Sequence, residues 1–226
     1  MNNKEIYNKL VKILNKQDSD YMKTLEEIKK ELEAEIITGG KINNGIKQAF
    51  KRLQKENEIR TKFQNVLRNG NDTYSITNGY FMVTYNGQNL PDELKPYINP
   101  NEKEIDEGLQ FDRLKNSGDL GYELSYVSIN YDNLLKIYKY NKVNKKRNFY
   151  TMHNGFTFNI QYLLDILALL KEKDLSNVKL EISEHTHHPM NIYSDNGKGI
   201  LLPIRMETEE IEEQLRLQEK IIKGEW

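Results

Sequence analysis

The stretch that decides the fold runs through residues 149–206, and its centre reads Phe156-Thr-Phe-Asn-Ile-Gln-Tyr-Leu-Leu-Asp-Ile-Leu-Ala-Leu-Leu170. The pattern predicts a short strand that runs directly into an apolar helix. A strand at 178–182 is expected next, and then a hairpin that closes on Leu201-Leu202-Pro203-Ile204-Arg205. This order of elements predicts an α+β core and is more typical of scaffolds than of enzymes.

Working outward, the sequence upstream repeats the order of a helix followed by strands. A helix from residue 42 is expected to lead into strands at 60–68 and 73–76, a Thr77-Asn78-Gly79 turn and a strand at 80–85. Residues 86–121 read as a long connector, because Pro91, Pro96 and Pro100 and several glycines interrupt them. A strand at 126–129 and a helix at 132–140 complete a central domain over 41–206.

The two ends of the chain are expected to be helical. Residues 1–40 read as a helical hairpin that stops at Gly39-Gly40, and residues 207–226 read as an acidic helix. Each carries a narrow apolar seam, formed in the first by Met22, Leu25, Ile28, Leu32 and Ile36 and in the second by Ile211, Leu215, Ile221 and Ile222. Such seams need a partner. The two arms are therefore expected to pack together, or to make the chain a homo-oligomer.

Composition excludes several classes of protein. The net charge of −1 over 226 residues does not indicate a polyanion partner in bulk, so any such role must come from local patches. The absence of cysteine excludes disulfides and thiolate chemistry and is compatible with a reducing cytoplasm. No apolar run approaches the ~20 residues that a bilayer-spanning helix needs, so a cytoplasmic protein without membrane contact is expected.

Enzyme signatures are also missing from the sequence. It contains no phosphate-binding glycine loop and no nucleophile elbow, and Gly197-Lys198-Gly199 reads as a hairpin turn. The segment Glu184-His185-Thr186-His187-His188-Pro189 could place His185 and His187 on one face of a strand as zinc ligands. An exposed polar loop explains the same residues more simply, and His153 stands alone. We therefore expect no catalytic residue, no metal and no cofactor.

Basic residues gather on one arc of the helix that starts at residue 42. The arc opposite its apolar side carries Lys47, Lys51, Arg52 and Lys55. A second basic run comes later in the chain, at Lys142, Lys145, Lys146 and Arg147. Lysine and arginine on one face neutralise phosphates and release counterions. A solvated helix face is the alternative interpretation of the same pattern.

Two segments carry a family resemblance. Together with residues 149–206, Ile76-Thr-Asn-Gly-Tyr-Phe-Met82 resembles the repeating domain of the bacterial DNA polymerase III beta subunit, the sliding clamp, over about residues 42–206. In that family a Thr-Asp-Gly turn precedes an aromatic and aliphatic strand, and here Asn78 replaces the aspartate. The last strand of the family domain ends in an aliphatic-Pro-aliphatic-Arg motif.

The resemblance implies an antiparallel sheet backed by two helices that present basic side chains to duplex DNA. That role maps onto Lys47, Lys51, Arg52, Lys55, Lys136 and Lys139. The closing segment contributes to a pocket for partner peptides in the family, and here it comprises Leu202, Pro203, Ile204, Arg205 and Met206. The second helix departs from the family, because residues 160–170 offer only Asp165 and no basic side chain.

Two functions remain open at this point. One is a non-enzymatic clamp-like protein of phage or mobile-element type, which binds DNA or replication proteins without sequence specificity and encircles DNA only as several copies. The other is a protein-interaction module or inhibitor that keeps the clamp-like fold, does not bind DNA and contacts host proteins through its terminal helices. A histidine-dependent metalloenzyme is a distant third.

Overall fold

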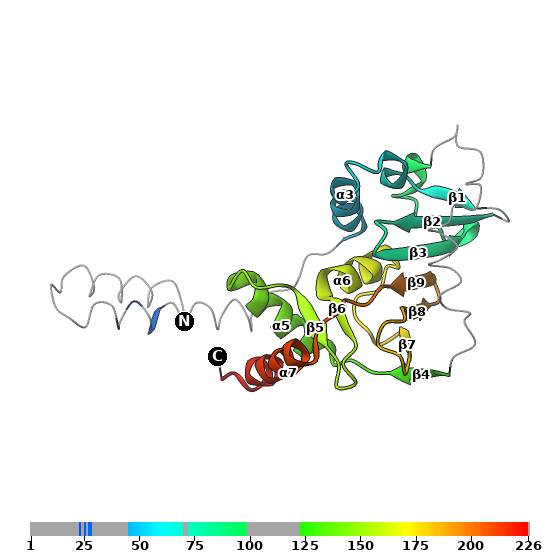
Figure 1. The fold of residues 1–226 in the computed structure, drawn as a ribbon. Coiled ribbons are helices and arrows are strands. Elements are labelled where there is room, and N and C mark those ends of the chain that lie inside the picture. Colours follow the sequence, from blue (N-terminus) through cyan, green and yellow to red (C-terminus); the bar gives the residue numbers. More distant parts are fainter. Residues whose placement is uncertain are drawn as a thin grey trace, which may run out of the picture.

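The computed structural model describes residues 45–69, 72–98 and 123–225, together with Lys23, Leu25, Glu27 and Ile28. It is an α+β protein with a seven-stranded antiparallel sheet and, within the ranges from residue 45 onward, four α-helices (Figure 1). None of the helices in these ranges is long and apolar enough to cross a membrane.

The elements follow one another in two similar units with a linking part between them. The first unit comprises α3 (Ile46–Glu56), η1 (Thr61–Gln64), β1 (Leu67–Asn69), β2 (Thr73–Thr77) and β3 (Phe81–Asn86). The linking part comprises η2 (Gly87–Asn89), η3 (Lys95–Tyr97), β4 (Leu124–Val127), α5 (Tyr131–Val143) and β5 (Phe149–Thr151). The second unit comprises β6 (Thr157–Asn159), α6 (Ile160–Leu169), β7 (Lys179–Ser183), β8 (Met190–Ser194) and β9 (Gly197–Leu201), and α7 (Thr208–Lys223) ends the described chain.

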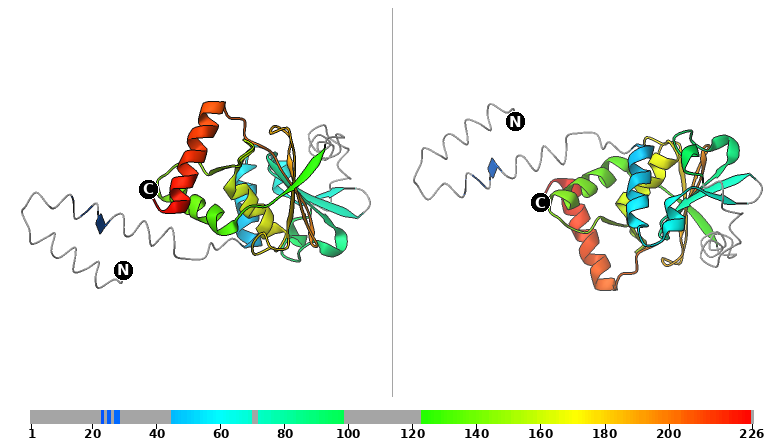
Figure 2. Two further views of the ribbon diagram at one scale, coloured as in Figure 1. Left: turned by 90° about the horizontal axis from the view of Figure 1, so that it is seen from below. Right: turned by 90° about the horizontal axis from the view of Figure 1, so that it is seen from above.

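The two units meet in the middle of the sheet. The strand order is β1-β2-β3-β9-β8-β7-β4, and the central pair β3 and β9 joins the units with Phe81 opposite Leu201. The helices α3 and α6 lie side by side on one face of this sheet (Figure 2). A helix followed by three strands therefore occurs twice, as the sequence predicts.

Helix α6 forms the centre of the core because its sequence is apolar on most sides, with Asp165 as its one charged residue. All residues from Leu163 to Leu170 are buried, and the side chain of Asn159 caps the helix by accepting a hydrogen bond from the Gln161 amide. The helix lies so close to β9 that a Cβ on Gly199 would stand 2.7 Å from Cγ2 of Ile166. A glycine at this position permits the contact between helix and sheet.

A further layer covers the side of α6 that faces away from the sheet (Figure 2). Here α7 packs against α5 and β5, and a capping box formed by Glu207 and Glu210 starts α7. The buried Gln218 side chain accepts a hydrogen bond from the Thr151 amide at 2.7 Å and donates one to the Thr151 carbonyl at 2.9 Å. The C-terminal helix is thus docked on the body of the domain.

The expected N-terminal hairpin at 1–40 lies almost entirely outside the described residues. The exceptions are the four residues named above, which are helical, and among them the Ile28 side chain is buried. The predicted pairing of the two terminal arms therefore stays a prediction.

Several predicted boundaries are corrected. Residues 60–68 are not one strand but η1 followed by the short β1, because Nδ2 of the buried Asn57 donates to the carbonyls of Phe63 and Thr77 and holds a tight turn there. Strand β4 begins and ends two residues earlier than predicted, and α5 is longer than expected.

The connector at 86–121 also differs from the prediction at its start. Residues 86–98 contain two short helices and bury Leu90 and Leu94, and the Val66 amide donates to the Tyr97 carbonyl at 3.0 Å. The rest of that connector lies outside the described residues.

Candidate nucleic-acid interface

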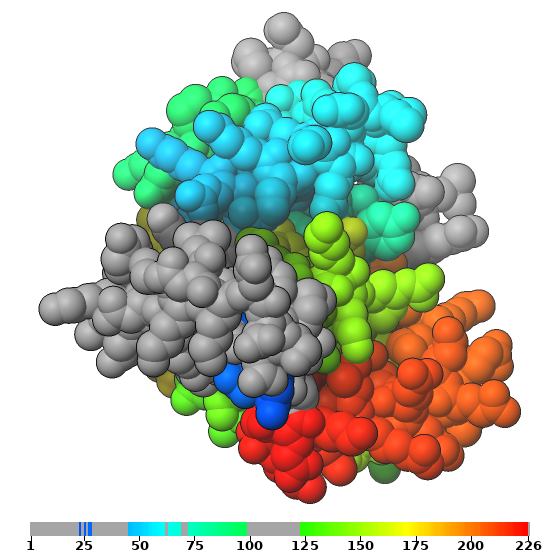
Figure 3. Space-filling view, turned by 90° about the vertical axis from the view of Figure 1, so that its left-hand side faces the viewer, coloured from blue at the N-terminus to red at the C-terminus, as the bar shows by residue number. Residues whose placement is uncertain are grey.

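The exposed side of α3 carries three lysines in line. Lys47, Lys51 and Lys55 are all exposed, whereas Ala49, Phe50 and Leu53 on the other side of the helix are buried. We call these three residues the lysine stripe. Successive members are four residues apart and therefore rise about 6 Å per step along the helix. Figure 3 shows α3 in light blue at the surface of the molecule, and no member of the stripe forms an ion pair within the described part of the chain.

Arg52 does not belong to this surface. Its Nη2 lies 2.5 Å from Oδ1 of Asp165, and its Nε lies 3.2 and 3.3 Å from the two carboxylate oxygens. The Asp165 side chain is only 3% exposed, and Nε2 of Gln161 donates a further hydrogen bond to it at 2.9 Å. The predicted basic arc of four residues is thus divided, because the guanidinium group serves to hold α3 against α6 and to compensate a buried charge.

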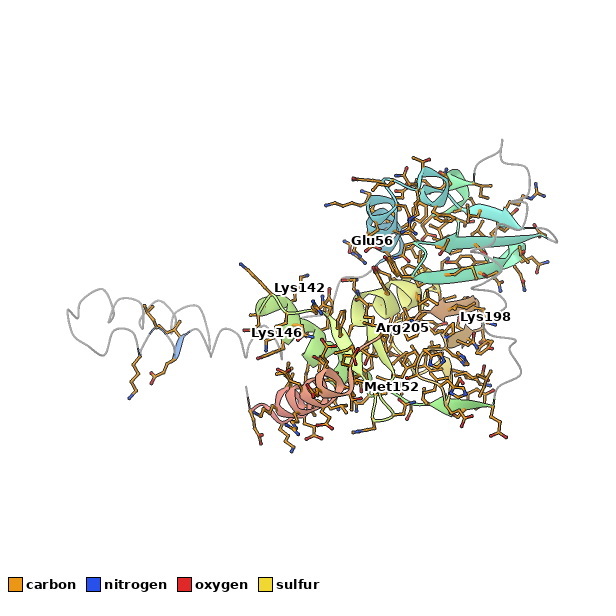
Figure 4. All side chains as sticks on the ribbon, viewed as in Figure 1. Glu56, Lys142, Lys146, Met152, Lys198 and Arg205 are labelled. Carbon is orange, nitrogen blue, oxygen red and sulfur yellow. The ribbon has the colours of Figure 1, made fainter. Side chains whose placement is uncertain are left out.

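A second polar contact at this seam involves Glu56 at the end of α3 (Figure 4). Its Oε2 accepts a hydrogen bond from Nδ2 of Asn78, while Oδ1 of Asn78 accepts from the amides of Tyr80 and Phe81. Desolvation, with the charge of Asp165 adding to it, raises the pKa of Glu56. Asparagine therefore suits the turn, since an aspartate in place of Asn78 could not donate and would oppose a second carboxylate.

Two aromatic rings border the same seam. Tyr80 is half exposed and stacks on Tyr162 of α6 with ring centroids 5.9 Å apart. Desolvation, followed by the nearby Glu56 carboxylate, raises the pKa of Tyr162 to about 12. The phenol therefore stays neutral over the ordinary range of pH, and the seam as a whole reads as a structural polar network.

The basic residues of α5 lie differently from the prediction. Lys136 and Lys139 are half-buried along the helix, and the exposed cations come at its C-terminal end, where they are Lys142, Lys145, Lys146 and Arg147. Figure 4 shows Lys142 and Lys146 at this end. Three of these cations lie over aromatic rings at 5.4 to 6.0 Å from the centroids, on Tyr138, Tyr140 and Phe149. The sequence shows the basic run at 142–147, but whether its side chains are exposed depends on how α5 packs.

The predicted partner-binding segment is not a strand. After β9 ends at Leu201, Leu202 packs against Met82 and Ile200, and the Ile204 amide donates to the Thr157 carbonyl at 2.7 Å. Pro203 has no amide to donate, which disfavours a continued ladder. Leu202, Pro203, Ile204 and Met206 are half-buried and Arg205 is exposed, so the segment is an irregular strap between the sheet and α7.

The histidines lie in the turn between β7 and β8 and not on a strand. The rings of His185, His187 and His188 gather with centroids 4.8 to 5.6 Å apart, and Nδ1 of His188 lies 3.1 Å from Oγ of Ser183. Desolvation, followed by the like charges of the other two rings, lowers the pKa of His188. His153 lies exposed in the turn between β5 and β6. No group of three metal-ligating side chains among the described residues is arranged to hold a metal ion.

Comparison with known proteins gives no relative for this chain. No protein-family model matches it, and neither does any curated protein or solved structure.

Proposed function

We propose that this protein is a non-enzymatic, clamp-like protein that binds the backbone of duplex DNA without reading its sequence. The observation that carries the proposal is the lysine stripe, three exposed ammonium groups in line on a well-packed helix. The two units of a helix and three strands support it, because they set α3 beside α6 on one face of a continuous sheet.

The chemistry of the stripe fits phosphates better than bases. Lysine is a flexible point charge without the planar fork that arginine uses to read guanine. Phosphate contacts position a protein on a duplex and carry no sequence information directly. Binding of the single chain is weak, because Arg52 is engaged with Asp165 and the stripe supplies only three charges.

The salt dependence of binding tests the proposal. Three phosphate contacts correspond to a log-log slope of about −2.7, since each contact contributes about −0.9 for B-form DNA. Affinity is measured by fluorescence anisotropy with two duplexes of unrelated sequence at several salt concentrations. The triple variant K47Q/K51Q/K55Q is expected to lose binding to both duplexes and to flatten the slope.

A matched control separates the effect of the lysine stripe on DNA binding from the effect of the net charge of the protein. The variant K179Q/K220Q/K223Q removes the same number of exposed lysines from β7 and α7 and is expected to bind as the wild type does. Circular dichroism checks that both variants fold. Equal losses in the two variants, or no affinity of the wild type at low salt, would reject DNA binding through the stripe.

One observation favours a second candidate function. The α6 helix is wholly buried from Leu163 onward, so most of it presents no surface to a duplex. A domain with only one accessible basic helix could serve as a protein-interaction module or inhibitor instead. A wild type without DNA affinity in the anisotropy assay would support this alternative.

A further inference from the structure

Strand β4 forms an open edge of the sheet. Within the described residues β4 pairs only with β7, and Figure 1 places it at the end of the sheet opposite β1. It exposes two large side chains, Tyr126 at 71% and Leu124 at 39%. Exposed apolar groups beside unpaired backbone donors and acceptors form a template for another strand.

The opposite edge of the sheet is protected, whereas no segment within 45–69, 72–98 and 123–225 pairs with the outer side of β4. Strand β1 has only three residues and an exposed Arg68, and the chain beside it is covered where Val66 pairs with Ile98. Short strands, charges, prolines and covering segments are the usual devices that block an edge. Strand β4 is also short, with four residues, but the sequence Leu124-Ser-Tyr-Val-Ser128 contains no charged residue and no proline.

We propose that β4 is an interaction surface for a second copy of this chain, which pairs with it in antiparallel fashion about a two-fold axis at Ser125. In this register Leu124 of one copy lies opposite Tyr126 of the other, and the contact occurs twice by symmetry. Cross-strand pairs of an aromatic and an aliphatic side chain stabilise antiparallel strands.

The faces of the two sheets agree in this arrangement. One row of paired residues crosses the sheet from β4 to β9. It runs from Tyr126 through Glu181 and Asn191 to Ile200. Ile200 is the neighbour of Gly199, which faces α6, so this row points away from the helices. Leu124 and Tyr126 therefore meet on the same outer face in both copies.

Charge is also compatible with pairing between two copies. No charged residue lies between Leu124 and Ser128, and the adjoining Glu123 falls opposite Val127 of the other copy. Like charges directly opposite each other, which destabilise strand pairs, do not occur in this register. The inference is independent of DNA binding, and it uses a different surface from the seams of the terminal helices.

The contact is small, so the dimer is expected to be weak. A single strand pair falls below the roughly 1,000 Å² of buried surface that a stable interface requires. Disulfide capture suits such a contact, and the chain has no cysteine of its own. The variant S125C places a thiol opposite its own copy, where antiparallel Cα atoms are about 4.5 to 5.5 Å apart, within the range for a disulfide.

The control variant is S128C, on the same exposed segment. In the proposed register Ser128 lies six positions out of line with its copy, a Cα separation of about 20 Å. Under mild oxidation S125C is expected to form a covalent dimer at least about ten times faster than S128C, a difference that corresponds to about 1.4 kcal/mol in the activation free energy. Equal rates, or a faster rate for S128C, would overturn the register.

A second variant tests the edge itself. Adding Y126K to S125C introduces a charge on the edge strand and is expected to return cross-linking to the rate of S128C. Circular dichroism and the melting temperature of Y126K show whether the fold is kept. Undiminished cross-linking in a folded Y126K/S125C protein would overturn the proposal, as would capture of an unrelated strand at β4 with the chain itself remaining monomeric.

Discussion

Replacing Arg52 by methionine should destabilise the fold although this residue lies on a solvated helix. Methionine keeps an aliphatic stem and a high helix propensity and removes the guanidinium group, with its charge and its hydrogen-bond donors to Asp165. The carboxylate of Asp165 is 3% exposed and would then remain inside the protein. Of the hydrogen-bond donors described above, only Gln161 would still contact it.

The size of the effect follows from the burial of the two groups. Removing one partner of a buried ion pair costs about 3 to 5 kcal/mol. The Arg52 side chain is 35% exposed, so water can reach the gap, and we expect about 2 to 3 kcal/mol. With a urea dependence of about 2 kcal/mol per molar, the midpoint should fall by about 1 to 1.5 M.

Urea unfolding followed by circular dichroism measures this shift, and two controls define its cause. Lys51→Met changes the neighbouring exposed residue and should stay within about 0.5 kcal/mol of the wild type. The double variant R52M/D165L removes both charges and should recover to within about 1 kcal/mol, because apolar groups of similar volume can replace a buried pair. If R52M costs no more than Lys51→Met, or if the double variant is less stable than R52M, the argument from the buried carboxylate is refuted.

Three other positions give sharp expectations. Gly199→Ala should cost about 1 to 3 kcal/mol in the free energy of unfolding by overpacking, because its Cβ would lie 2.7 Å from Cγ2 of Ile166; Gly45→Ala, whose Cβ meets nothing within 4 Å, should cost less than about 1 kcal/mol. Glu56→Gln should make the protein more stable at neutral pH, because the raised pKa of Glu56 means that its charged form is disfavoured in the fold, and a glutamine oxygen can still accept from Asn78. That gain should vanish below the ordinary pKa of 4.5, where the carboxyl is protonated in both states, so urea midpoints above and below this pH check the sign.

The local parts of the fold could be predicted from the sequence. The apolar run at 160–170 predicts α6, and the turn signals of Asn78 and Gly79 predict the hairpin of β2 and β3, because these elements depend on neighbouring residues. The sequence does not indicate the irregular strap after Leu201, since its alternating side chains resemble a strand until Pro203 interrupts the ladder.

The candidate site could be predicted only in part. The lysine stripe follows from helical spacing alone, and it lies where the sequence predicts. The contact between Arg52 and Asp165 joins residues 113 positions apart, and each looked ordinary by itself, one as a member of a basic arc and the other as an isolated acid. Only the packing of α3 on α6 shows that they form a pair.

The junction of β3 with β9 has a consequence for how the chain folds as it is made. Phe81 pairs with Leu201, 120 positions later, so β3 must wait for the last strand of the sheet. At about 5 to 20 residues per second, synthesis leaves its edge bare for roughly 6 to 24 s. The second unit closes through short hairpins as it emerges, and the first unit, although made earlier, completes its side of the sheet only afterwards.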